Sequence, residues 1–230
     1  MGASVAVIIV AAGDSRRLPG PVPKQWQPLL GAPLVAHSFR FFDSLAAVDQ
    51  MVVAVDAESL RRADRLRHLE SRHGKRVHVI AGGACRQMSV WLALQAVDPD
   101  PEIVLIHDAA RPFPPLEGVE QCIAAAREVG GAILAKPVTE TIKRVGPGNA
   151  IIGTIERNDL WAAQTPQGFR YQPLAAAYRA HEAELAQFTD DAAIFESNGG
   201  RVRAVMGSDC NFKVTTAEDF KRAEAMIAEG

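Results

Sequence analysis

The sequence predicts an α/β fold in which helices flank a mostly parallel sheet. Runs rich in valine and isoleucine recur along the chain, and segments with the apolar spacing of helices lie between them. A chain of 230 residues is long enough to bury a substantial core as one domain. No internal repeat or low-complexity linker interrupts the pattern. We therefore expect a single domain over residues 1–230.

The first half of the chain alternates between expected strands and expected helices. Strands are expected at residues 5–11, 51–55, 77–81, 103–107 and 132–135, because continuous apolar runs are typical of strands covered on both faces. Helices are expected at residues 34–42, 59–69, 89–96 and 119–129. This alternation predicts right-handed crossovers, and ligands of such sheets bind beyond the carboxyl ends of the strands.

The pattern changes after residue 137. Polar and apolar residues alternate around the turn Gly146-Pro147-Gly148-Asn149, which predicts a protruding β-hairpin arm at about residues 137–160. An isolated hairpin is marginally stable in water, so we expect the arm to pack on another surface, such as a second copy of the protein. Helices are then expected at 174–185 and 190–198, a strand at 201–206, and a final helix from Thr216, whose capping pattern includes Asp219.

The composition excludes several classes of protein. With 48% hydrophobic residues, 23% charged residues and a net charge of -2, the chain resembles an ordinary soluble protein, not a disordered or nucleic-acid-coating one. The N-terminal apolar run is too short to span a bilayer and lacks a basic leader, so we expect a cytoplasmic protein without a membrane or nucleic-acid partner. Cys85, Cys122 and Cys210 form no CxxC pair and are expected to be ordinary thiols.

The loop after the first expected strand carries a phosphate-binding pattern. Its candidate residues are Ala11, Ala12, Gly13, Arg16, Arg17 and Lys24. Glycine lets the backbone approach a ligand, and backbone amides together with cations can neutralise phosphate oxygens. The alternative is a solvated basic turn, since the loop has neither GxGxxG spacing nor a Walker A lysine. Pro23 favours a functional loop because it restrains the chain immediately before Lys24.

A second glycine-rich loop follows the strand expected at 77–81. Gly82 and Gly83 precede Ser89, and such a loop could hold a base or ribose through backbone groups and the serine hydroxyl. Taken alone, a plain turn with Ser89 near the start of a helix explains the pattern better. Arg86 in the same segment favours a ligand site.

A third candidate lies where the strand at 103–107 ends. Asp108 is well placed there to hold Mg²⁺ that bridges nucleotide phosphates, whereas His107 is expected only to orient the turn. The alternative is a capping Asp108 with Arg111 as its ion-pair partner. Lys213, just before the last helix, either reaches the same phosphates or lies on the surface as an ordinary lysine.

Together these segments resemble the 2-C-methyl-D-erythritol 4-phosphate cytidylyltransferase family of the non-mevalonate isoprenoid pathway. The matching segments, in order, are AAGDSRRL with PKQW, GGACRQMSV, HDAARP, KPVTETIKR, TIERNDLWAAQTPQGF, FTDDA and NFKVTTAEDF. They cover nearly the whole chain, and the related alditol phosphate cytidylyltransferases share several of them. The resemblance implies a Rossmann-like nucleotidyltransferase domain that uses CTP, a polyol phosphate and Mg²⁺.

The resemblance also implies roles for individual residues. Arg17, Lys24 and Lys213 would act on the α-phosphate region and the leaving group. The nucleotide would lie along Ala11, Ala12, Gly13, Gly82, Gly83, Ser89 and Asp108, with Asp108 also serving the metal. Arg111, Thr141 and Arg157 would hold methylerythritol phosphate, the last two reaching over from the arm of a neighbouring subunit, so the resemblance implies a homodimer.

Two departures and two rival functions accompany the resemblance. Ser15 stands where the family usually has glycine, and Ala84 and Met88 stand at positions that are often acidic, which weakens the case for side-chain selection of cytosine. A nicotinamide oxidoreductase is the rival enzyme class, but GxGxxG is missing after the first strand. A non-catalytic nucleotide-binding module is the other rival, suggested by the arm.

Overall fold

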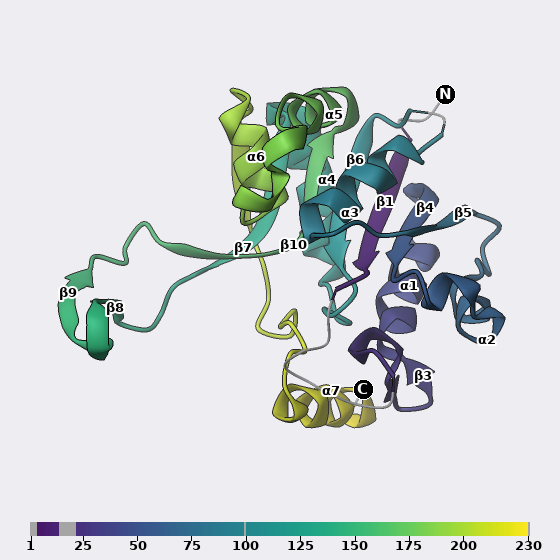
Figure 1. Cartoon of the computed structure of the whole chain (residues 1–230), viewed down its shortest axis with the longest axis horizontal. Helices are drawn as coiled ribbons and strands as arrows, with labels where there is room; N and C mark the ends of the chain where they lie inside the picture. Colours follow the sequence, from purple (N-terminus) through teal and green to yellow (C-terminus); the bar gives the residue numbers. More distant parts are fainter. Residues whose placement is uncertain (1–3, 14–21, 99, 230) are drawn as a thin grey trace.

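The central feature of the fold is a seven-stranded sheet with the order β11-β7-β10-β6-β1-β4-β5. A computed structural model describes residues 4–13, 22–98 and 100–229 (Figure 1). The strands are β1 Val5–Ala11, β4 Val48–Val55, β5 Arg76–Ala81, β6 Ile103–Asp108, β7 Gly131–Pro137, β10 Trp161–Arg170 and β11 Val202–Met206. β10 runs antiparallel to both of its neighbours, while the other pairings are parallel. The predicted mostly parallel sheet is therefore confirmed.

Helices cover both faces of the sheet, as the continuous apolar strands predict. Alternate side chains of β1 point to opposite faces: Val5, Val7 and Ile9 belong to one buried cluster, and Ala6 and Ile8 to another. The first cluster includes residues of α1 (Leu34–Ser44) and α4 (Leu116–Val129). The second includes residues of α3 (Arg86–Gln95), α5 (Tyr171–Ala180) and α6 (Asp191–Ser197).

A smaller cluster closes the carboxyl end of the sheet. It joins Leu29 of the short strand β2 (Pro28–Leu29) and Leu34 at the start of α1 to the C-terminal helix α7 (Ala217–Glu229), and β2 pairs with β3 (Ala32–Pro33). The predicted capping pattern of α7 is confirmed, because Thr216 N donates to Asp219 Oδ2 at 2.8 Å and Asp219 N donates to Thr216 Oγ1 at 3.2 Å. Among the described helices, none is long and apolar enough to cross a membrane.

Some predicted boundaries were wrong. The helix expected at 59–69 is broken into η2 (Ser59–Arg61), α2 (Ala63–Leu66) and η3 (Arg67–Leu69), because Arg62 is extended between them. α3 begins at Arg86 instead of residue 89, since Cys85 Sγ accepts a hydrogen bond from Met88 N and caps the helix. The helix expected at 174–185 is α5, which begins and ends earlier and is followed by the 3-10 helix η5 (Glu182–Gln187).

The strand β10 was not predicted, although it occupies the middle of the sheet. Its sequence WAAQTPQGFR has no run of branched apolar residues and contains a proline. Its register against β7 shifts between Ala163 and Gln167. Gly168 is required by close packing, because a Cβ there would lie 2.9 Å from Leu105 Cδ2 and 3.2 Å from Cys122 Sγ.

The predicted hairpin is confirmed and projects from the body of the molecule (Figure 1). β8 (Ile142–Val145) and β9 (Ile151–Ile155) pair in antiparallel fashion around the 3-10 turn η4 (Pro147–Asn149). Gly148 has a φ of 67°, which explains the glycine in this turn. Val145, Ile151 and Ile152 are each more than half exposed on this arm.

Candidate active site

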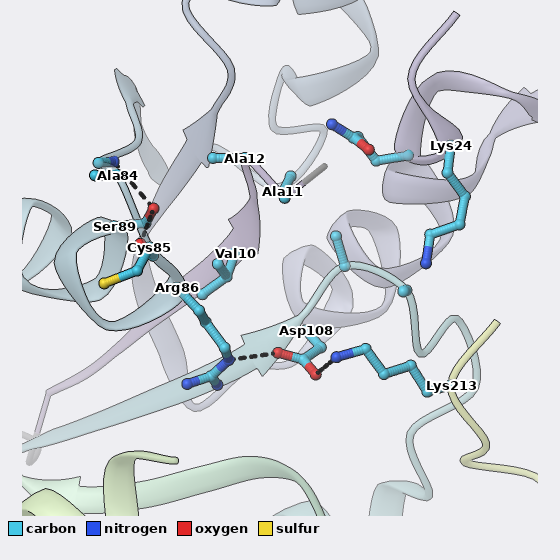
Figure 2. Close-up of a pocket in the computed structure, with 15 residues that line it drawn as sticks. Val10, Ala11, Ala12, Lys24, Ala84, Cys85, Arg86, Ser89, Asp108 and Lys213 are labelled. Carbon is cyan, nitrogen blue, oxygen red and sulfur yellow. Dashed lines mark hydrogen bonds and ion pairs between the residues drawn. The ribbon is translucent and has the colours of Figure 1, made fainter. Parts of the chain in front are cut away.

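A cavity of about 340 Å³ lies at the carboxyl ends of the central parallel strands (Figure 2). It is lined by Val10, Ala11, Ala12, Gly13, Lys24, Gln25, Gly83, Ala84, Cys85, Arg86, Ser89, Asp108, Ala109, Ala110 and Lys213. These residues come from the ends of β1 and β6, from residues 24–25, from the loop between β5 and α3 with the start of α3, and from the segment before α7. The structure thus brings together the three loops and the C-terminal lysine that the sequence singled out.

Not every candidate residue lines the cavity. Arg16, Arg17 and Ser15 lie outside the described residues. Gly82 lies immediately behind the lining, and Arg111 is not part of it. Thr141 and Arg157 are exposed beside β8 and β9 of the arm, and neither lines the cavity of its own chain.

Lys24 is positioned by a short, well-anchored turn. It begins the 3-10 helix η1 (Lys24–Trp26), which follows Pro23 directly, and the indole of Trp26 is only 5% exposed. Lys24 Nζ donates a hydrogen bond of 2.6 Å to the carbonyl of Val214. Because Val214 follows Lys213 in sequence, this contact ties the first loop to the C-terminal side of the cavity.

Asp108 is the centre of a buried charge network (Figure 2). Its Oδ1 accepts from Arg86 Nε at 2.9 Å, and its Oδ2 accepts from Lys213 Nζ at 2.7 Å. Burial alone would raise the pKa of Asp108, but the charges of Arg86 and Lys213 outweigh it and hold this pKa well below its usual range. The carboxylate therefore stays ionised and fixes two cations beside the cavity.

The proposed ion pair between Asp108 and Arg111 was wrong. The Arg111 guanidinium donates through Nη1 to the carbonyl of Asn211 at 2.7 Å, while the backbone N of Arg111 donates to Asp108 O at 3.0 Å. Burial lowers the pKa of Arg111 from its ordinary value. Arg111 therefore helps to hold the segment that carries Lys213, and its predicted contact with the substrate stays a prediction.

Asn211 is a further anchor of that segment, which sequence reasoning missed. Its side chain is fully buried, and Nδ2 donates to Thr165 O at 2.8 Å and to Gln164 Oε1 at 3.1 Å. Both acceptors lie on β10, the strand that was not predicted. The available signal was an asparagine two residues before Lys213, in the segment NFK, but its partners on β10 were not apparent from local spacing.

The second loop uses its serine internally. Ser89 Oγ accepts from Gly83 N at 3.0 Å and donates to Cys85 O at 3.0 Å. A Cβ at Gly82 would lie 2.2 Å from Ala12 Cβ and 2.8 Å from Ser89 Oγ, so glycine is needed where this loop packs on the first one. Ser89 shapes the cavity wall in this structure, and a direct nucleotide contact stays a prediction.

His107 orients the turn after β6, as expected. It is fully buried; Nε2 donates to the carbonyl of Arg111 at 2.9 Å, and Nδ1 accepts from Thr165 Oγ1 at 3.1 Å. The carbonyl can only accept, so the proton resides on Nε2 of a neutral ring. Burial is the main cause that lowers the pKa of His107 to about 4.

This pKa predicts a loss of stability in acid. The unfolded chain binds a proton at His107 near its ordinary pKa of 6.5, whereas the folded chain resists it down to about 4. The stabilisation from neutral His107 is fully present above pH 6.5 and is lost as the pH falls from 6.5 to 4. The total loss in the free energy of unfolding is about 3 kcal/mol. Urea denaturation at pH 7.5 and 5 should show the loss, and His107→Gln should reduce the difference. An unchanged pH dependence in that variant would contradict the assignment.

The described residues do not form a complete metal site of their own. No group of three or more His, Cys, Asp or Glu side chains among them could hold a metal ion. Of the described lining residues, Asp108 alone carries a carboxylate. Mg²⁺ usually keeps several waters and binds one or two carboxylates together with substrate phosphates. The donor set therefore fits Mg²⁺ carried by a nucleotide, provided that Lys213 leaves Asp108 Oδ2.

Comparisons with known proteins agree with one another. The family model for IspD, 2-C-methyl-D-erythritol 4-phosphate cytidylyltransferase, matches residues 5–229. A 2-C-methyl-D-erythritol 4-phosphate cytidylyltransferase of Symbiobacterium thermophilum is 40% identical over 98% of this chain and 93% of the relative. One from Cereibacter sphaeroides is 41% identical over 98% of this chain and 97% of the relative.

Solved structures show the same likeness in three dimensions. The 4-diphosphocytidyl-2C-methyl-D-erythritol synthase of Anaerococcus prevotii superimposes with a TM-score of 0.83 at 26% identity, covering 97% of this chain and 96% of the other. The 2-C-methyl-D-erythritol 4-phosphate cytidylyltransferase of Francisella tularensis gives a TM-score of 0.81 at 30% identity, covering 96% and 99%. With the family model matched along nearly its whole length, the chain belongs to the 2-C-methyl-D-erythritol 4-phosphate cytidylyltransferase family.

Proposed function

We propose that the chain transfers the cytidylyl group of CTP to 2-C-methyl-D-erythritol 4-phosphate, giving CDP-methylerythritol and pyrophosphate in isoprenoid biosynthesis. Membership of the family over residues 5–229 is the observation that carries this function. It favours methylerythritol phosphate over other alditol phosphates and excludes the nicotinamide alternative. The cavity with lysines on two sides is consistent with it.

The reaction explains why the cavity is lined with cations. A phosphate oxygen of the acceptor attacks the α-phosphorus of CTP in line with the departing pyrophosphate. A phosphate monoester is already a competent nucleophile near neutral pH, since its second pKa is about 6. The main obstacle is the meeting of two anions, so the site must orient them and neutralise charge that develops on the phosphorus and the leaving group.

Lys24 and Lys213 are proposed to supply this charge, together with Arg17. Lys24 is fixed by η1, and Lys213 is stored on Asp108 until a phosphate oxygen replaces that carboxylate. Asp108 would then be able to hold Mg²⁺ together with the phosphates of the nucleotide. When bound, the metal would neutralise phosphate charge and orient the triphosphate. We assign the glycine-rich loop Gly82-Gly83 and Ser89 to the cytidine side, because that loop lines the opposite wall.

The arm is proposed to complete the site of a second subunit. Thr141 and Arg157 are exposed and do not line the cavity of their own chain, and the arm that carries them projects from the body of the molecule (Figure 1). Three large apolar side chains of the hairpin are exposed as well, and a partner surface would bury them. Both observations support a homodimer in which each arm carries Arg157 to the acceptor phosphate of its neighbour.

A pyrophosphate-release assay tests the proposed function. CTP with methylerythritol phosphate and Mg²⁺ is expected to exceed ATP, GTP and UTP, and ribitol phosphate is expected to be a poor acceptor. Chelation of Mg²⁺ with EDTA is expected to abolish release. Preference for ribitol phosphate would overturn the assigned acceptor, and full activity in EDTA would overturn the metal proposal. Absence of pyrophosphate release with every pair of substrates would overturn the assignment as a nucleotidyltransferase.

A further inference from the structure

A buried hydrogen-bonded chain leads from the helical layer to the cavity. Tyr178 Oη donates to Asp191 Oδ1 at 2.5 Å, and Asp191 Oδ2 accepts from Arg86 Nη2 at 2.8 Å. Arg86 Nε continues to Asp108 Oδ1 at 2.9 Å, and Asp108 Oδ2 holds Lys213 at 2.7 Å. Five side chains from α5, α6, α3, β6 and the segment before α7 are thus connected in a line.

The end of this hydrogen-bonded series that lies away from the cavity, at Tyr178 and Asp191, is held in place. Asp191 and Tyr178 are both 0% exposed. Asp191 begins α6, whose first turn is fixed to β10 because Gln167 Oε1 accepts from Ala192 N and Gln167 Nε2 donates to Asp190 Oδ2. Burial, followed by the charge of Asp191, raises the pKa of Tyr178 well above its usual range, so its hydroxyl keeps its proton and donates. The chain therefore has a fixed anchor and a fixed direction.

The other end of the hydrogen-bonded series, at Arg86 and Asp108, lies at the cavity. Arg86 lines the cavity and is gripped by carboxylates on two sides, Asp191 behind it and Asp108 in front of it. An arginine gripped by one carboxylate alone could follow it as it moves, whereas two carboxylates define its plane. Since Arg86 holds one oxygen of Asp108, it also sets where the other oxygen holds Lys213 (Figure 2).

We propose that Asp191 and Tyr178 are positioning residues of the reaction, which act through Arg86 to fix Asp108 and Lys213 before substrates bind. This inference rests on the proposed function. Neither residue lines the cavity, so neither is a catalytic residue. The competing explanation is that the two residues only hold α5 and α6 against α3.

The chain offers a matched pair of variants that separates these explanations. Tyr178→Phe removes the hydroxyl that fixes Asp191 but keeps the ring, which stacks on Trp91 at 6.1 Å. Tyr171→Phe removes another buried hydroxyl from the same helix, one that donates to Leu94 O at 3.0 Å and lies outside the chain of contacts. We expect Tyr178→Phe to lower kcat by about tenfold and Tyr171→Phe to leave it within about twofold of wild type. An equal loss in both variants, or none in either, would overturn the proposal.

Two further measurements sharpen the test. In an Asp108→Asn background, Tyr178→Phe should cost less than about twofold, because its route to Lys213 is already cut; a full tenfold loss there would indicate a purely structural role. The ¹⁵N resonance of Arg86 Nε–H, assigned by its loss in Arg86→Lys, should shift in Tyr178→Phe and stay unchanged in Tyr171→Phe. This resonance needs no turnover, so it tests the link from Tyr178 to Arg86 separately from activity. An unchanged resonance in Tyr178→Phe would overturn the link, whereas inactivity of the wild-type protein in the pyrophosphate assay would overturn the proposed function.

Discussion

Lys24→Ala is expected to lower kcat with CTP and methylerythritol phosphate by about 10²–10³-fold, the usual loss when one preorganised charge-stabilising group is removed. Lys24 lines the cavity and is fixed by η1 and by its hydrogen bond to Val214 O. Its charge is therefore in place before substrates arrive and costs little to organise. Steady-state kinetics of pyrophosphate release measures the effect.

The control for this variant is a lysine that carries the same charge but lies outside the cavity. Lys221 is exposed on α7 and does not line the cavity, so Lys221→Ala should keep near wild-type kcat. Thermal unfolding should show that Lys24→Ala remains folded, with a loss of about 1 kcal/mol from the missing hydrogen bond. Turnover of a folded Lys24→Ala variant within a fewfold of wild type would refute its role.

Mixed dimers of two inactive variants are expected to regain about half of wild-type activity. One variant is Lys24→Ala, which changes its own cavity, and the other is Arg157→Ala, which changes the arm that is proposed to reach the neighbouring subunit. In the mixed dimer, one cavity has both defects and the other has neither. Co-expression with two affinity tags isolates this species, and light scattering should show the mass of a dimer.

The matching control replaces the second chain by a Lys24→Ala, Arg157→Ala double variant, which leaves no intact site and should give no recovery. Inactivity of a purified mixed dimer would show that Arg157 does not act across subunits. Protein that remains monomeric at working concentration would contradict the shared site altogether. Full activity of Arg157→Ala by itself would remove this residue from the acceptor site.

The sequence predicted those parts of the fold whose cause is local. The strands at residues 5–11 and 103–107 were predicted because both faces are buried, and burial on both faces leaves a continuous apolar run. β10 also lies inside the sheet, yet several of its residues are determined by contacts with neighbouring helices and not by burial in the sheet. Gly168 makes room for α4, and Gln167 holds the start of α6, so the strand carries no strand-like pattern.

The same distinction holds for the site. Lys24 and Asp108 were singled out because position after a strand is visible in sequence, and both line the cavity. Arg86 was noticed but given no role, and Asp191 was noticed only as part of a matching segment. They are 105 residues apart, and no spacing rule connects a carboxylate at the start of one helix to an arginine at the start of another. Only the tertiary fold, which brings the first residue of α6 within hydrogen-bond distance of the first residue of α3, reveals the pair.

The tether between Lys24 and the carbonyl of Val214 spans 190 residues, and that between Asp108 and Lys213 spans 105. A growing chain on the ribosome can pair its early strands long before these two partners have been synthesised. The cavity, in contrast, cannot be complete before residues 213 and 214 are present. A ligand held by both Lys24 and Lys213 can therefore stabilise the fold only after the C-terminal segment has joined the first loop.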